Sequence, residues 1–319
     1  MNNFWHKMKR PIIGLAPMDS VTDEPMRQIQ TMIARPGLMY TEFLSVDGFL
    51  KKPDVFIKHL KYSPNERPII VQLFGADPKS FESVIKKVSS LGFDGIDINM
   101  GCPARSIVRK GGGGGLIGNF NLSREILETV YQGICRTKRN IPLSVKTRIG
   151  EDKETTKNWF DFLSKFPLSA VCIHGRMLSQ GLSGRVKWEE VKLAAKILHS
   201  RGILCLGNGD VKSLDDAYSK CKLYDLDGIL IGRAALGNPW VFLGDARPSK
   251  EEIFKVIIQH SELVSSFYRK EDFIKARKHF GWYCRNFYDS KRLKVELMTA
   301  KSKHDVVEII NKFDNHSHA

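Results

Sequence analysis

The sequence predicts an α/β fold in which a closed (β/α)8 barrel is followed by a small domain made only of helices. Short apolar segments recur along residues 11–233, and most are followed by a longer amphipathic segment. Strands that alternate with helices indicate βαβ units and a parallel sheet. Several of the apolar segments end in polar residues, and in a barrel the carboxyl ends of the strands converge on the face that holds active sites. An open, doubly wound sheet remains the alternative.

Each predicted strand is a run of apolar residues bounded by glycine, proline or polar residues. The eight strands are predicted at 11–17, 38–44, 68–75, 95–101, 142–148, 169–175, 203–209 and 227–233. The functional-looking residues at their ends are Pro17, Met18, Gln72, Asn99, Lys146, His174, Asn208, Gly232 and Arg233. In a barrel these residues gather on one face.

The segments between the strands have the spacing of apolar residues that is typical of amphipathic helices. Helices are predicted over 77–92, 123–138, 155–166, 187–202 and 213–225.

The strand pattern stops after residue 243, and only helical patterns follow, over 250–270, 272–287 and 302–313. We therefore expect a barrel domain over residues 1–243 and a helical domain over 244–319, with a disordered tail at 314–319. Residues 267–303 carry eleven Lys or Arg against four Asp or Glu, with aromatic residues between them. Most of the aromatic side chains suit a helix-bundle core, and the basic faces are a candidate RNA-contacting surface.

Composition excludes several classes of protein. With 42% hydrophobic and 27% charged residues over 319 positions, the chain is neither disordered nor collagen-like. It has no apolar run of about 18 residues, so we expect no membrane span. Its first residues contain no apolar segment before a small-residue cleavage site, so we expect no secretory signal. The six cysteines are scattered without a CxxC pair, which predicts a reducing, cytoplasmic setting and no metal site. The net charge of +15 favours a polyanionic partner, although a solvated basic surface would also explain it.

Cys102 directly follows the fourth predicted strand and stands three residues after Asn99. A cysteine at the mouth of a barrel can act as a nucleophile or as a proton donor. The glycine run at 111–115 either lets backbone approach a ligand closely or forms a flexible loop. The other cysteines, expected to be small buried side chains, are Cys135, Cys172, Cys205, Cys221 and Cys284.

The loops after the seventh and eighth predicted strands, at 206–211 and 231–240, contain glycines and Arg233. Barrels often bind phosphate with these two loops, through backbone N–H groups. Asn208 and Asp210 suit the hydroxyls of a ribityl or ribose chain. Glycine-rich loops of this kind can also be purely structural.

Lys146 and Arg148 lie two residues apart on the fifth predicted strand, so their side chains are expected on the same face. Two such charges inside a barrel are costly unless they meet anions or acceptors, or reach solvent at the rim. His174 ends the sixth predicted strand, a position that favours a functional role over a core histidine.

Taken together, these motifs resemble the tRNA-dihydrouridine synthases, flavin-dependent enzymes that reduce uridine in tRNA. The resemblance covers residues 11–243 and, more loosely, the helical segment. The motifs are APMDSVTDEPMR at 16–27, TEFLSVDG at 41–48, VQLFG at 71–75, DGIDINMGCP at 94–103, VKTRIG at 145–150, IHGR at 173–176 with Gln180, NGDV at 208–211, DGILIGRAALGNPWVF at 227–242 and RKHFGWY at 277–283.

The resemblance implies FMN as the cofactor, NADPH as the electron donor and tRNA as the partner. It implies that Cys102 is catalytic and gives a proton to the uracil ring. It assigns the target uracil to Asn99, Arg148 and Arg176. The FMN-binding positions that it implies are Pro17, Met18, Asp19, Ser20, Gln72, Lys146, His174, Asn208, Gly209, Asp210, Gly232 and Arg233.

One residue departs from the family pattern. Arg105 stands where many members have lysine, which puts a substrate contact in doubt because a planar guanidinium replaces a compact ammonium. Two alternatives stay open: an FMN barrel that reduces a free pyrimidine-type metabolite, and a tRNA-binding protein without catalysis.

Overall fold

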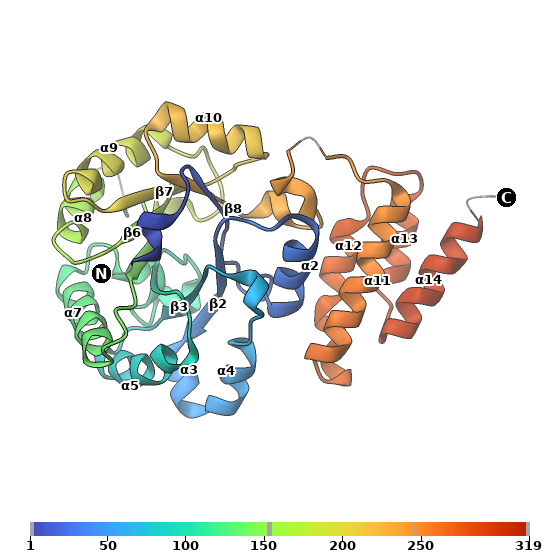
Figure 1. Ribbon diagram of the computed structural model, residues 1–319, viewed down its shortest axis with the longest axis horizontal. Coiled ribbons are helices and arrows are strands. Elements are labelled where there is room, and N and C mark those ends of the chain that lie inside the picture. The colour runs from blue at the N-terminus through green and yellow to red at the C-terminus, as the bar shows by residue number, and fades with distance from the viewer. Residues whose placement is uncertain (1–2, 152–154, 245, 317–319) are drawn as a thin grey trace.

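The computed structural model describes residues 3–151, 155–244 and 246–316, and it contains the predicted parallel strands (Figure 1). They form one sheet in the order β1-β8-β7-β6-β5-β4-β3-β2. The strands are β1 (Ile12–Leu15), β2 (Met39–Ser45), β3 (Ile69–Phe74), β4 (Gly95–Met100), β5 (Leu143–Arg148), β6 (Ala170–His174), β7 (Leu204–Asn208) and β8 (Gly228–Ile231). Each agrees with a predicted strand to within two residues at either end.

The sheet closes into a ring between β1 and β2. Gly14 forms a parallel bridge with Leu38, and the backbone N–H of Leu15 donates to the carbonyl oxygen of Leu38 at 2.9 Å. Position 14 has no room for a side chain, because a Cβ there would lie 2.9 Å from that same oxygen. The barrel prediction is therefore confirmed, and the open-sheet alternative is wrong.

The helices predicted between the strands are also confirmed. They form the outer ring of the barrel together with shorter helices that the sequence did not reveal (Figure 1). The helices of this part are α1 (Phe4–Lys7), α2 (Glu24–Ala34), α3 (Val46–Lys51), α4 (Pro53–His59), α5 (Pro78–Val88), α6 (Arg105–Val108), α7 (Phe120–Arg136), α8 (Thr155–Leu163), α9 (Trp188–His199) and α10 (Leu214–Tyr224). None of the helices in the described part of the chain has both the length and the hydropathy needed to cross a membrane.

The barrel interior is apolar in the half that is near the start of the strands. Ile70, Leu206 and Leu230 pack there, and Trp5 of α1 joins them with no exposed surface. The short helix is held in place by Asn3, whose Nδ2 donates to Ser169 Oγ at 2.9 Å. Polar side chains enter the interior beyond this apolar plug, beginning with Ser144 and Asp97, whose side chains form a hydrogen bond of 2.6 Å.

The helical segment forms its own core beside the barrel (Figure 1). Its helices are α11 (Lys250–Phe267), α12 (Arg277–Tyr283), α13 (Ser290–Leu297) and α14 (Lys303–His316). The single helix predicted over 272–287 is wrong, because a 3-10 turn (Lys270–Ala276) precedes α12 and helix α12 ends at Tyr283. The predicted disorder at 314–319 is wrong for 314–316, which belong to α14, and 317–319 lie outside the described residues.

Helix α2 joins the two parts, and Figure 1 shows it between the barrel and α11. On the helical side, Ile29 lies in the core of the helical segment, and Tyr268 Oη donates to Asp23 Oδ2 at 2.7 Å. On the barrel side, Arg27 pairs with Glu66, and both side chains have no exposed surface. Arg27 also donates to the carbonyl oxygen of Thr22 at 2.8 Å, so its buried guanidinium has a hydrogen-bond partner besides Glu66.

We expect Glu66→Gln to lower the free energy of unfolding by about 3–5 kcal/mol, because the Arg27 charge stays buried without its counter-ion. Urea unfolding of the purified variant measures this value.

The matched control is Glu82→Gln, which removes an ion pair to Arg136 that is exposed on both sides. Its expected effect is within about 0.5 kcal/mol. Equal losses for the two variants would contradict the view that the buried pair fixes α2.

Candidate active site

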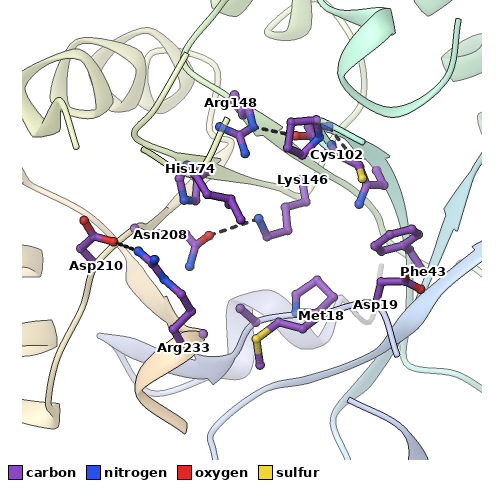
Figure 2. A pocket seen from close by; sticks show the side chains of 18 of the residues that line it. Met18, Asp19, Phe43, Cys102, Lys146, Arg148, His174, Asn208, Asp210 and Arg233 are labelled. Carbon is purple, nitrogen blue, oxygen red and sulfur yellow. Dashed lines mark hydrogen bonds and ion pairs between the residues drawn. The ribbon is translucent and has the colours of Figure 1, made fainter. Parts of the chain in front are cut away.

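A cavity of about 300 Å³ lies at the carboxyl ends of the strands, where the sequence predicted a site (Figure 2). The predicted site residues that line it are Pro17, Met18, Asp19, Asn99, Cys102, Lys146, Arg148, His174, Asn208, Gly209, Asp210, Gly232 and Arg233. Lys146 and Arg148 face it from the same side of β5, as the alternation along the strand predicts.

Three predicted site residues do not line the cavity. Ser20 is exposed and has a left-handed backbone, with φ 57°. Gln72 is fully buried inside the barrel, where Nε2 donates to Asp97. Arg176 is also buried, and its guanidinium is held by the carbonyl oxygens of Ser183 and Gly184 and by Asp210. Their assigned contacts with a cofactor or a base remain predictions.

The sequence analysis missed several apolar residues of the cavity wall. Phe43 reaches the cavity next to an irregularity in the pairing of β2 with β3, and Leu182 and Val211 line it from loops. Phe43 lies inside the motif at 41–48, which was the available signal; nothing in the sequence marked Leu182. Arg105, the departure from the family pattern, is exposed at the first residue of α6.

Lys146 provides a partly buried positive charge in the middle of the cavity (Figure 2). Its Nζ donates to Asn208 Oδ1 at 3.2 Å. Burial lowers the pKa of Lys146, and the neighbouring charge of Arg148 adds to this effect. Arg148 itself donates to the carbonyl oxygen of Gly101 at 2.7 Å, which fixes its guanidinium at the cavity wall.

His174 points into the same cavity as a neutral ring. Burial, followed by the charges of Lys146 and Arg148, lowers the pKa of His174 to about 2. Its buried Nδ1 has no hydrogen-bond partner among the described residues. A buried polar atom without a partner is costly, so this nitrogen is available to a bound ligand.

One end of the cavity carries the loops after β7 and β8. Asp210 pairs with both Arg176 and Arg233 there, and Figure 2 shows its contact with Arg233. The hydrogen bond from Arg176 is the main cause that lowers the pKa of Asp210. Backbone of Gly209 and Gly232 lines the same end. Arg233 and the glycine backbone at this end suit a phosphate group.

The Cys102 loop is held on two sides. Asn99 Oδ1 accepts from the backbone N–H of Cys102 at 2.9 Å, and the N–H of Gly114 donates to the Cys102 carbonyl at 2.9 Å. A Cβ at Gly114 would lie 2.9 Å from that carbonyl oxygen and 2.3 Å from Leu178 Cδ1. The glycine run therefore packs closely against the Cys102 loop, and none of its residues lines the cavity.

Burial raises the pKa of the Cys102 thiol, so it is protonated at neutral pH. This state suits a proton donor better than a nucleophile. The expectation that the other cysteines are buried is confirmed for Cys172, Cys205 and Cys221; Cys284 is half-buried. It is wrong for Cys135, which is exposed on α7.

The donor set of the cavity fits a flat, anionic cofactor. The partly buried ammonium of Lys146, the unpartnered Nδ1 of His174 and the glycine-containing loops after β7 and β8 lie around one space. The described residues contain no group of three or more His, Cys, Asp or Glu side chains placed to hold a metal ion.

Asp97 is a buried carboxylate that the sequence analysis did not select. It lies below the cavity with no exposed surface. Burial raises the pKa of Asp97 to about 6, and hydrogen bonds from Ser144 and Gln72 and the charge of Lys146 oppose this only in part.

This shift predicts a pH dependence of stability. Between about pH 4 and 6 the folded protein keeps a proton on Asp97 that the unfolded chain has released, so stability is lost as pH rises through this window. We expect the free energy of unfolding of the wild type, relative to Asp97→Asn, to fall by about 3 kcal/mol from pH 4 to pH 7. Urea unfolding at the two pH values measures the difference.

Asp77→Asn is the control of opposite sign. Asp77 caps α5, and its hydrogen bond from Ser80 lowers its pKa, so its contribution is lost as pH falls. The same direction for both variants would contradict the assignment.

Solved structures support the fold. Morphinone reductase, in a structure described as a complex with tetrahydroNAD, matches with a TM-score of 0.50 over 75% of this chain and 89% of that chain, at 10% identity. At such low identity the match shows a shared fold and nothing about substrates.

Curated relatives match along nearly the whole chain. A probable tRNA-dihydrouridine synthase of Staphylococcus aureus (strain COL) is 28% identical over 98% of this chain and 96% of its own length. Probable tRNA-dihydrouridine synthase 2 of Bacillus subtilis (strain 168) is 28% identical over 98% and 97%, respectively. The family model described as dihydrouridine synthase matches residues 14–317. Since that match spans the barrel and the helical segment alike, the chain belongs to the dihydrouridine synthase family.

Proposed function

We propose that this protein reduces the C5–C6 double bond of uridine in tRNA to dihydrouridine, with FMN as its cofactor and NADPH as the electron donor. Family membership over residues 14–317 is the observation that carries the proposal. The cavity supports it, because the Cys102 thiol and the Lys146 ammonium line the same space. The match to relatives named for tRNA favours tRNA over a free pyrimidine as the substrate.

The residues present suit FMN. Gly209, Gly232 and Arg233 would hold the phosphate, and Asn208 and Asp210 the ribityl hydroxyls. When bound, FMN supplies the hydride that reduces the uracil ring. Further expected contacts are Pro17, Met18, Asp19, Ser20 and Gln72.

Lys146 and His174 would lie at the ring of the cofactor. Lys146 is a partly buried positive charge, held by its bond to Asn208, that would stabilise negative charge on a neighbouring ring. Neutral His174 offers Nδ1 to a ring atom and adds no charge of its own.

Cys102 would give its proton to C5 of the uracil. Its raised pKa keeps the proton on the sulfur until the ring carbon takes it. Asn99, Arg148 and Arg176 would hold the base. A base in folded RNA must leave its stack to reach such a cavity.

The helical segment would bind the RNA backbone near the cavity mouth. Burial raises the pKa of Asp19, a cavity-lining residue, and the charge of Lys278 on α12 partly opposes this rise, so α12 lies close to the rim. Several other basic residues are engaged within the protein: Arg277 donates to the carbonyl of Ala300 and Arg292 pairs with Asp289. Lys278 and Lys291 are therefore better candidates than Arg277 and Arg292 for contact with RNA phosphates.

The proposal predicts that the purified protein releases FMN on denaturation and forms dihydrouridine in tRNA when NADPH is supplied. Cys102→Ala should reduce tRNA about 10²–10⁴-fold more slowly, the usual contribution of a positioned general acid. Flavin content and its reduction by NADPH should be unchanged. Stopped-flow absorbance and mass spectrometry of tRNA nucleosides measure the two steps.

Cys135→Ala is the control, since that thiol is exposed on α7. Wild-type turnover by the Cys102→Ala enzyme would remove Cys102 from the mechanism. Release of FAD, or no reaction with tRNA, would contradict the proposal itself.

We expect Lys278→Gln with Lys291→Gln to weaken tRNA binding and to flatten its salt dependence, by about one unit of slope for each phosphate that the variant no longer binds. Filter binding over a range of salt concentrations measures the slope.

Lys192→Gln with Lys196→Gln is the matched control, because both lysines are exposed on α9, across the barrel from the helical segment (Figure 1). Equal slopes for the two double variants would place the RNA elsewhere on the molecule.

A further inference from the structure

A line of hydrogen bonds runs from the middle of the barrel to the Cys102 loop. Gln72 Nε2 donates to Asp97 Oδ2 at 2.7 Å, and Asn99 Nδ2 donates to Gln72 Oε1 at 3.0 Å. Asn99 Oδ1 then accepts from the backbone N–H of Gly101 at 3.1 Å and of Cys102 at 2.9 Å. We call Asp97, Gln72 and Asn99 the relay.

The hydrogen-bonding groups at the two ends of the relay determine how the side-chain amides of Gln72 and Asn99 are oriented. A carboxylate only accepts hydrogen bonds, so Gln72 must turn its NH₂ group toward Asp97 and its oxygen toward Asn99. Backbone N–H groups only donate, so Asn99 must turn its oxygen toward Cys102. Because both ends require the same direction, neither amide can turn over without losing a bond.

Burial makes these bonds consequential. Asp97 and Gln72 have no exposed surface, and Asn99 has only 6%. Water cannot replace a missing partner at this depth, and an unmatched polar group there is costly. One end of the relay reaches the cavity, because Asn99 and the neighbouring Cys102 line the cavity wall. Asp97, at the other end, does not line the cavity.

We infer that Asp97 is a positioning residue, which acts through Gln72 and Asn99 to hold the Cys102 loop in the position from which the thiol meets the base. The inference rests on the proposed reaction of Cys102. Asp97 touches neither the cavity nor Cys102, so any effect that it has on the position of the Cys102 loop passes through the two amides.

Asp97→Leu tests this, because leucine keeps the approximate shape and removes the acceptor. The step to measure is the single-turnover oxidation of the reduced flavin by tRNA, which is separate from reduction by NADPH. We expect it to slow about 10- to 100-fold, since small displacements of a reacting group cost rates of this order. An unchanged rate would overturn the inference.

Gln72→Met is the second variant, which breaks the relay one link later and leaves Asp97 beside Lys146. If Asp97→Leu does not fold, Gln72→Met alone tests the inference. It also separates two causes, because Asp97 acts electrostatically on Lys146 as well. Slowing in Asp97→Leu without slowing in Gln72→Met would mean that Asp97 acts through Lys146, and would overturn the relay.

Coupling to Asn99 distinguishes positioning from a general loss of structure. In an Asn99→Ala background the relay is already cut, so adding Asp97→Leu or Gln72→Met should slow the tRNA step by less than about threefold. Full multiplication of the separate losses would contradict action through Asn99. Ser144→Ala is the matched control: Ser144 Oγ donates to the other oxygen of Asp97 at 2.6 Å, outside the relay, and its removal should leave the rate within about threefold.

A readout without RNA keeps this inference separate from the proposed function. Iodoacetamide labels Cys102 and the exposed Cys135. Peptide mass spectrometry gives the ratio of the labelling rate of Cys102 to that of Cys135. Release of the loop should raise that ratio about tenfold in Asp97→Leu and Gln72→Met, but not in Ser144→Ala. If the wild type fails to reduce tRNA while the ratio still rises, the proposed function fails and the relay stands. An unchanged ratio overturns the relay.

Discussion

A carboxylate buried inside an eight-stranded barrel must find its hydrogen bonds and its counter-charge within the barrel, because water does not reach it. Asp97 finds them on the strands around it: Ser144 and Gln72 donate to it and Lys146 attracts it. Lys146 in turn donates to Asn208, which ties β5 to β7 at the level where the cavity begins. The site therefore depends on the opposite charges of Asp97 and Lys146 and on the hydrogen bonds that they receive or donate. These groups lie next to the apolar cluster of the barrel interior that includes Trp5.

Much of the fold was predictable because each barrel strand leaves a local signal. Parallel strands buried on both faces give continuous apolar runs, and all eight were found with small errors at their ends. Helix α2 was missed although Asp23 caps it and Pro25 stands in its first turn, which together mark a helix start. Helix α13 is short and highly charged, so its pattern gave little periodicity. Its place depends on contacts with α12 and α14 that no local pattern encodes.

The site was predictable as far as strand ends and alternation determine it. They placed Lys146 and Arg148 on one face, and the same alternation would have placed Asp97 inside, two residues before Asn99. They could not say which way an amide or a guanidinium turns. Gln72 donates to Asp97 and Arg176 donates to Asp210, and both partners lie far away in sequence.

The position of α2 has a consequence for how this protein can be divided. Ile29 of α2 and Trp240 after β8 belong to the core of the helical segment, although both precede residue 243. A fragment cut at that point would carry these side chains, and Ile33 beside them, into water. Contiguous apolar surface of this kind promotes self-association. Truncation or exchange of the helical segment therefore requires redesign of α2 as well, and the chain is better treated as one folding unit than as two exchangeable modules.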